Sequence, residues 1–107
     1  MAGKHDKVKD ENRYSILVKQ LDKCYICGTS SGVALHEVFY GTANRKKSKE
    51  DGMIIPLCGV HHNMSGIGVH YNKELDLRLK QYAQRVWMKY YDKTEEDFID
   101  RFGQNYL

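Results

Sequence analysis

Two short motifs of metal-ligand type constrain this chain more than any other feature of its sequence. CYIC carries Cys24 and Cys27, and CGVH, about thirty residues later, carries Cys58 and His61. Each motif holds two ligands separated by two residues, and together they offer the four soft or borderline donors of a closed tetrahedral zinc site. The two motifs therefore predict a structural zinc centre that joins distant parts of the chain.

The sequence leaves the fourth zinc ligand open, because His62 or His70 could take the place of His61. CYIC alone would also suit two buried thiols or a redox pair. The second motif makes a metal site the better interpretation, and three cysteines cannot all pair with one another in disulfides.

The length of 107 residues predicts a single domain, residues 1–107, in which a bound metal would matter for stability. No apolar run is long enough to span a bilayer, and the charged start MAGKHDKVKDENR is not followed by a segment of the signal-peptide type. We therefore expect a soluble, cytoplasmic protein with no membrane partner and with a flexible N-terminus at residues 1–13.

The first half of the chain predicts short strands. Residues 14–19 are rich in β-forming side chains, residues 32–40 are apolar between glycines, and residues 52–58 form another apolar run. Pro56 in the last run favours an edge strand, because proline cannot donate to a sheet. The segment between the last two strands, residues 41–50, reads as a basic loop.

The second half, residues 72–107, has a helical pattern. From Asn72 the apolar residues recur three and four apart, and acidic residues precede basic ones by four positions on the other face. This pattern predicts a long amphipathic helix whose aromatic stripe belongs to the core. Thr94 and Asp97 then predict the start of a short final helix that ends at Gly103.

The order of four motifs, CYIC, LHEVFYG, NRKKS and IIPLCGVHH, resembles the zinc-containing branch of the HNH endonuclease superfamily, the ββα-metal nucleases. It is especially similar to small phage-encoded HNH proteins of the recombination-enhancement, RecA-dependent kind. The resemblance covers residues 24–70. It implies an α+β fold, with a small ββα-metal core and a zinc knuckle, to which the long and the short C-terminal helices are added.

The resemblance also implies a catalytic site. His36 matches the strand-borne ligand and His62 the helix-borne ligand of a divalent cation such as Mg²⁺, Mn²⁺ or Zn²⁺. Glu37 occupies the position of the usual histidine base, and an alternative register makes His36 the base and Glu37 a ligand. Asn44 is the nearest residue to the asparagine of the family motif.

The basic segment completes this picture, because its cations would contact phosphates without choosing a sequence. These residues are Arg45, Lys46, Lys47 and Lys49. The expected function is a metal-dependent DNA endonuclease of low sequence specificity in phage replication, recombination or packaging, with DNA and a recombination protein such as RecA as partners. The alternative is a non-catalytic zinc-finger module that binds DNA. The surplus of candidate ligands favours a second metal and therefore the enzyme.

Overall fold

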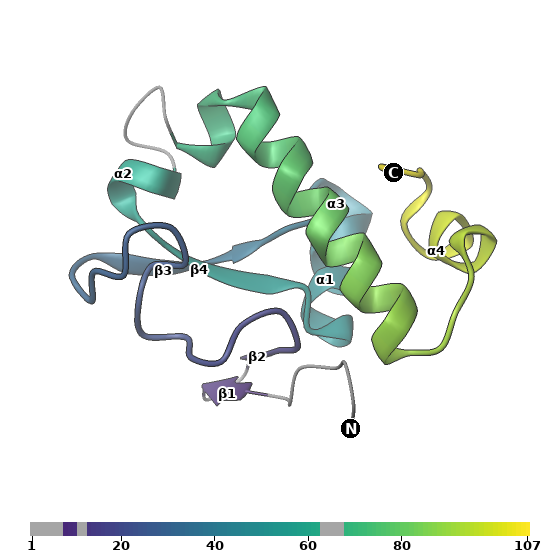
Figure 1. The fold of residues 1–107 in the computed structure, drawn as a ribbon, viewed down its shortest axis with the longest axis horizontal. Coiled ribbons are helices and arrows are strands. Elements are labelled where there is room, and N and C mark those ends of the chain that lie inside the picture. The colour runs from purple at the N-terminus through teal and green to yellow at the C-terminus, as the bar shows by residue number, and fades with distance from the viewer. Residues whose placement is uncertain (1–7, 11–12, 63–67) are drawn as a thin grey trace.

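The computed structural model describes residues 8–10, 13–62 and 68–107. They form a small mixed α/β structure with two separate two-stranded antiparallel sheets and four α-helices in the described part of the chain (Figure 1). The elements are β1 (Val8–Asp10), β2 (Arg13–Ser15), β3 (Val33–Glu37), α1 (Thr42–Asp51), β4 (Ile54–Cys58), α2 (Gly59–His62), the 3₁₀ turn η1 (Val69–Tyr71), α3 (Lys73–Tyr90) and α4 (Glu95–Phe102).

The pair β3 and β4 crosses the middle of the molecule (Figure 1), and its register places His36 opposite Ile55 and Leu35 opposite Pro56. Strands were expected in both regions, and both expectations are confirmed. Among the described strands β4 pairs only with β3, so Pro56 lies in an edge strand as predicted. All five residues of β4 are nevertheless buried, because loops and helices cover the strand.

The expected basic loop at residues 41–50 is wrong, because this segment forms helix α1. Its alanine, lysine, arginine and glutamate residues are good helix formers, which the basic composition and flanking glycines concealed. Gly52 ends the helix in the left-handed conformation at φ 75°, and its N–H donates to the carbonyl of Ser48. The connection between β3 and β4 is thus a rigid element.

The strand expected at residues 14–19 is much shorter than predicted. Only its first part belongs to β2, which pairs with β1, and the chain then leaves the sheet. The Ser15 hydroxyl donates to the carbonyl of Ile54 at 2.7 Å, and the N–H of Ile16 donates to that of Gly52 at 3.0 Å. These bonds replace a strand ladder, so the segment stays buried without pairing. The predicted flexible N-terminus falls mostly outside the described residues; inside them, β1 pairs with β2.

The long helix is confirmed as α3. The Asn72 side chain accepts a hydrogen bond from the N–H of Leu75 at 3.1 Å and so caps the first turn. Both predicted ion pairs form, Glu74 with Arg78 at 2.7 Å and Asp76 with Lys80 at 2.8 Å. None of the helices in the described ranges has the length and apolar character needed to cross a bilayer.

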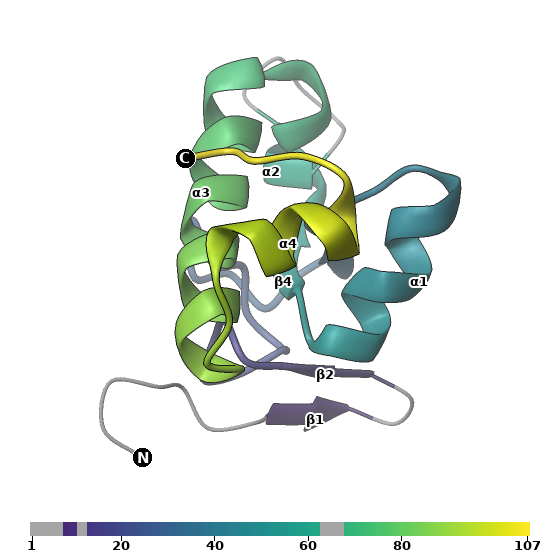
Figure 2. The ribbon, with the colours of Figure 1, turned by 90° about the vertical axis from the view of Figure 1, so that its right-hand side faces the viewer.

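The final helix is confirmed as α4, with a capping box between Thr94 and Asp97 and with Gly103 at φ 87° after its last turn. It lies between α1 and α3 in Figure 2. The rings of Phe98 and Phe102 pack against Phe39, with centroids 5.2 and 4.6 Å away. The C-terminal half of the chain therefore closes the core next to β3.

Candidate metal centres

The two motifs CYIC and CGVH meet in space. Cys24 and Cys27 lie in the loop before β3, Cys58 ends β4, and His61 lies in the single turn of α2. Their ligand atoms all lie within 4.8 Å of one another. His61, rather than either alternative histidine, is therefore the fourth member of the cysteine cluster.

The distances in this cluster fit a tetrahedral metal. The Cys27 and Cys58 sulfurs are 3.8 Å apart, and His61 Nδ1 lies 3.3 Å from the Cys58 sulfur and 3.7 Å from that of Cys24. Zinc bond lengths of about 2.3 Å to sulfur and 2.0–2.1 Å to nitrogen give tetrahedral edges of roughly 3.8 Å between sulfurs and 3.6 Å from sulfur to nitrogen. These four residues could therefore bind a metal such as zinc.

Local hydrogen bonds explain why the first motif forms a tight turn. The Gly28 N–H donates to the carbonyl of Cys24 at 2.8 Å, and the Cys24 N–H donates to that of Thr29 at 2.8 Å. Gly28 adopts φ 78°, a conformation that a side chain would disfavour. The Tyr25 N–H donates to the carbonyl of Pro56 at 2.8 Å and so ties the turn to β4.

The electrostatics favour the metal-binding form of Cys24. Burial raises the pKa of its thiol, but backbone N–H groups of Cys58, Cys27 and Ile26 donate to the sulfur and lower the pKa from 9.0 to about 6. The thiolate is the form of cysteine that ligates metals. The lowered pKa of Cys24 therefore favours the thiolate, which is the form that binds a cation.

A second donor cluster consists of three histidines from three elements, His36 in β3, His62 in α2 and His70 in η1. The Nε2 atoms of His62 and His70 are 3.1 Å apart, and the ring of His36 lies 5.2 Å from each of the other two rings. His36 and His62 were predicted to share a cation. His70 joins them rather than the cysteines.

His36 carries the strongest sign of a missing ligand. Its side chain is only 3% exposed, and its Nε2 has no hydrogen-bond partner among the described residues. Burial, followed by the charges of His62, His70, Lys80 and Arg45, lowers the pKa of His36 from 6.5 to about 3. A buried polar atom without a partner usually indicates an ion or water that binds there, and the neutral ring suits a cation.

A polar group that sequence reasoning missed borders the histidines. The Tyr40 ring lies 5.9 Å from the His36 ring, and its hydroxyl donates to Asp76 at 3.1 Å. Lys80 pairs with the same carboxylate and sits 4.3 Å from the centre of the Tyr40 ring. The sequence signal was weak, since Asp76 and Lys80 read only as a helical ion pair. The group brings a half-buried cation, Lys80, close to the histidines.

Two residues that the resemblance placed in the catalytic site have other contacts. Glu37 follows His36 on β3 and faces away from it, as strand alternation requires, and its carboxylate pairs with Arg13 at 2.8 Å. The Asn44 amide donates to the carbonyl of Phe102 at 3.1 Å. Neither residue belongs to the donor clusters of the described residues. Asn44 fastens α1 to α4.

The basic residues lie on α1 and do not share one face. Arg45, Lys46 and Lys49 are exposed and, at 100° per residue, fall within a 100° arc. Lys47 lies roughly opposite Arg45 and is half-buried. Ser48 is buried, and its hydroxyl donates to the Phe39 carbonyl at 2.7 Å and accepts from the Phe39 N–H at 3.1 Å. Its role is therefore to anchor α1.

Comparison with protein-family models, with curated proteins and with solved structures finds no match for this chain. What the two centres do therefore has to follow from the chemistry of their side chains.

Proposed function

We propose that the protein is a metal-dependent phosphodiesterase that nicks or cuts DNA, with a core of the ββα-metal type. The observation that carries the proposal is the second donor cluster, His36, His62 and His70, formed in addition to a complete set of four zinc ligands. A zinc-finger module needs only the first set. The buried Nε2 of His36, which faces the other two histidines and has no partner among the described residues, would be costly without a second cation.

The arrangement of the elements supports the proposal. His36 comes from the first strand of the hairpin β3–β4, and His62 comes from the turn of helix that follows the second strand. This is the order of ligands that the HNH resemblance implies. The cysteine cluster holds His61, the neighbour of His62, and thereby fixes the start of the turn that carries both residues.

The donor set favours particular metals. Imidazole nitrogens suit zinc and other first-row transition metals, whereas Mg²⁺ prefers oxygen ligands. Three protein ligands leave a position for water or a phosphate oxygen, as in catalytic zinc sites. A cation bound there would act as a Lewis acid on the phosphate and lower the pKa of a bound water. Among the metals expected from the sequence, we therefore favour Zn²⁺ over Mn²⁺ and Mg²⁺.

The charges near the histidines suit an anionic substrate. Arg45 and Lys80 both contribute to the lowered pKa of His36, which means that their positive charges act at the cluster. Arg45 is exposed on α1 beside Lys49 and Lys46, so a phosphate chain reaching the histidines would pass these cations. Contacts of this kind provide affinity without sequence specificity. A partnership with a recombination protein such as RecA, in a phage setting, stays a prediction of the resemblance.

The ion pair of Glu37 with Arg13 argues against the role of base or metal ligand that was first expected for Glu37. Its ion pair with Arg13 stabilises the carboxylate on the opposite side of the strand from His36, so it would have to leave this partner to act as a base or a ligand. Its negative charge still acts on His62, where it opposes the lowering of the pKa caused mainly by burial. We therefore assign Glu37 an electrostatic influence on the cluster and expect water activation to depend on the three histidines.

The test compares two adjacent histidines. His62→Ala should retain the tightly bound zinc and melt close to the wild type, while plasmid nicking with added Mn²⁺ or Zn²⁺ falls to background. His61→Ala is the matched control, and it should lose zinc and stability together, because metal binding and folding are coupled in small domains. His36→Ala should behave like His62→Ala, and Glu37→Gln should retain most of the activity.

A second measurement avoids dependence on activity alone. Titration of the zinc-loaded wild type with Co²⁺ or Zn²⁺ should reveal one additional site that His36→Ala lacks. If the wild type nicks no plasmid with any metal and takes up no second cation, the protein is a zinc-finger module and the enzyme proposal fails. A His62→Ala protein that has lost its first zinc would instead contradict the assignment of the ligands.

A further inference from the structure

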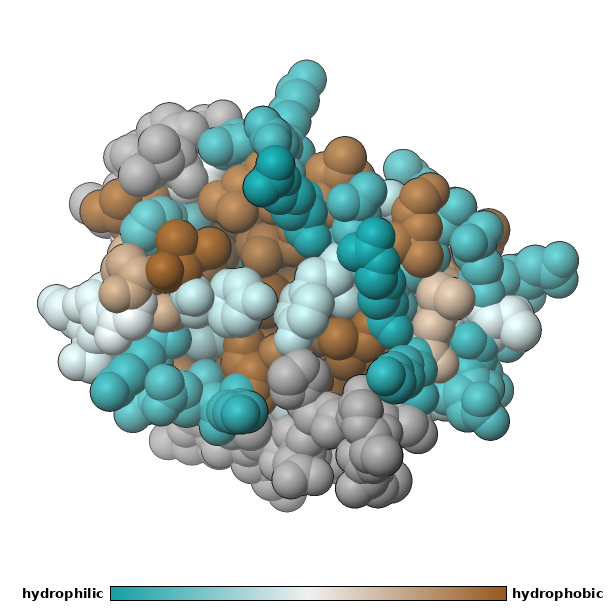
Figure 3. Space-filling model, viewed as in Figure 1, coloured by the Kyte–Doolittle hydropathy of each residue, from teal (hydrophilic) through white to brown (hydrophobic). Residues whose placement is uncertain are grey.

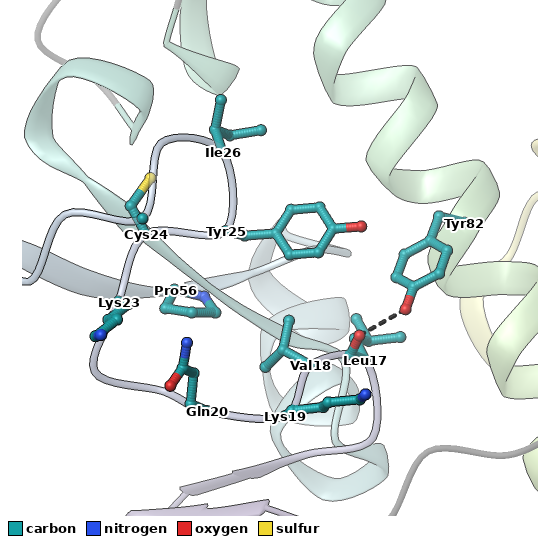
Figure 4. Close-up of a pocket in the computed structure, with 11 residues that line it drawn as sticks. Leu17, Val18, Lys19, Gln20, Lys23, Cys24, Tyr25, Ile26, Pro56 and Tyr82 are labelled. Carbon is teal, nitrogen blue, oxygen red and sulfur yellow. Dashed lines mark hydrogen bonds between the residues drawn. The ribbon is translucent and has the colours of Figure 1, made fainter.

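A cavity of about 560 Å³ lies beside the cysteine cluster, where Cys24 and Gly28 of the CYIC turn contribute to its lining. Its floor includes Leu17, Val18 and Pro56, and its wall includes Tyr25 and Tyr82 (Figure 4). This volume is in the range of small-ligand pockets, which run from about 300 to 1,000 Å³. Figure 3 shows apolar surface on this face of the molecule between hydrophilic side chains. Cys24 of the cysteine cluster also lines the cavity, whereas none of the three clustered histidines does.

The two tyrosines hold their rings in fixed positions. Their centroids are 6.1 Å apart and the ring planes differ by 21°. The Tyr82 hydroxyl donates to the carbonyl of Leu17 at 2.6 Å, drawn as a dashed line in Figure 4. Tyr25 is held by its backbone bond to Pro56 and lies between two cysteines of the cluster, yet its side chain is 44% exposed. An accessible aromatic face is therefore preorganised at the cavity.

The rim of the cavity is positively charged. Lys19 and Lys23 are exposed, and the residues lining this cavity include no aspartate or glutamate in the described part of the chain. In Figure 4 Lys23 and Lys19 stand at opposite ends of the loop, with Gln20 between them. The cavity thus combines a flat aromatic surface, an amide and two separated cations, a set that matches a planar base flanked by phosphates.

We propose that this cavity binds an unpaired base of single-stranded DNA, with the phosphates on either side of that nucleotide against Lys19 and Lys23. The base would stack on Tyr25, since aromatic stacking with a basic rim is the usual way in which proteins bind single strands without sequence choice. A duplex cannot present an unstacked base to the cavity. The proposal rests on the proposed function only for the identity of the polymer, and it adds a preference for single-stranded regions near the cutting site.

The test uses a short single-stranded oligodeoxynucleotide with one 2-aminopurine, in buffer without added divalent cation, so that cleavage plays no part. Binding to the wild type should quench the 2-aminopurine fluorescence, and Tyr25→Ala should weaken binding on the order of tenfold with loss of the quenching. Tyr25→Phe should preserve both. Tyr25→Leu retains apolar bulk without the flat ring, and it serves if the alanine variant loses zinc or melts early.

A charge-matched comparison isolates the lysines. The double variant Lys19→Ala with Lys23→Ala should weaken binding and flatten its salt dependence, because two phosphate contacts are lost. Lys89→Ala with Lys93→Ala removes the same charge from exposed positions at the other end of α3 and beyond it, and it should have a much smaller effect.

The outcomes separate this proposal from the nuclease proposal. If the protein quenches the 2-aminopurine fluorescence but cuts no DNA, the cavity proposal stands and the nuclease proposal fails. A protein that nicks plasmid but binds single and double strands equally, without quenching, overturns the cavity proposal alone. Equal binding of the oligonucleotide by the wild type and by Tyr25→Ala would also overturn the cavity proposal. So would a competition experiment in which an apolar peptide displaces the oligonucleotide and unlabelled single-stranded DNA does not.

Discussion

Replacing Ser48 by alanine tests how helix α1 is held in place, because the Ser48 hydroxyl joins the helix to Phe39. In Ser48→Ala the Phe39 N–H and carbonyl lose their hydroxyl partner, and both residues are fully buried. A buried polar group left without a partner costs about 1–3 kcal/mol, so the two groups together cost about 2–6 kcal/mol. The better helix propensity of alanine, worth roughly 0.5 kcal/mol, offsets a small part. We expect a net loss of about 1.5–5.5 kcal/mol.

This loss is large enough to measure by thermal unfolding. For a domain of this size each kcal/mol shifts Tm by roughly 4 °C, so Ser48→Ala should melt about 6–22 °C below the wild type. Circular dichroism of the zinc-loaded protein gives the midpoint. Ser31→Ala is the matched control, because Ser31 is exposed and its change should move Tm by no more than about 2 °C.

A measurement of DNA affinity shows whether the Ser48 hydroxyl anchors α1 or contacts a phosphate of the DNA. At a temperature where both proteins are folded, Ser48→Ala should bind DNA with wild-type affinity, because its hydroxyl faces Phe39. An unchanged Tm would refute the energetic reasoning. A normal Tm combined with weaker DNA binding would show that the hydroxyl contacts phosphate instead.

Two further predictions follow from the cysteine cluster and from α1. If the cysteine cluster holds zinc, Cys58→Ala should lose that zinc and, with it, cooperative melting, because a metal there would join the CYIC turn to the end of β4. Metal analysis after gel filtration checks this, and a variant that still melts cooperatively at the wild-type Tm would contradict it. Arg45→Ala with Lys49→Ala should weaken DNA binding about equally on all sequences and reduce its salt dependence. Lys47→Ala, on the other side of the helix, should have little effect, and an equal loss there would mean that the exposed arc does not define the interface.

Local sequence was sufficient wherever the physical cause is local. The helix α3 and its ion pairs follow from the spacing of side chains along one helix, and the capping box of α4 involves residues three positions apart. The two half-sites for zinc could be recognised because two ligands separated by two residues are near each other in almost any compact turn. The strand β4 followed from its apolar run, and its edge position from Pro56.

The places where prediction failed involve contacts between residues far apart in the chain. α1 read as a loop because its composition is polar, whereas its C-terminal end is set by Gly52 and its position by the bond between Ser48 and Phe39. The assignment of Asn44 to the catalytic site stays a prediction of the resemblance, and its order in the chain did not suggest the bond that its amide donates to the carbonyl of Phe102, 58 positions later. No local pattern contains that information.

The sequence by itself determined the ligand types, the zinc half-sites and the helical C-terminal half, because these depend on residue chemistry and short spacing. Only the tertiary structure decided which histidine belongs to which cluster. His61 and His62 are neighbours in the chain, yet the turn of α2 sends one ring to the cysteines and the other to His36 and His70. A one-residue step on a helix rotates the side chain by about 100°, and only the packing of β3, α2 and η1 fixes what lies in each direction.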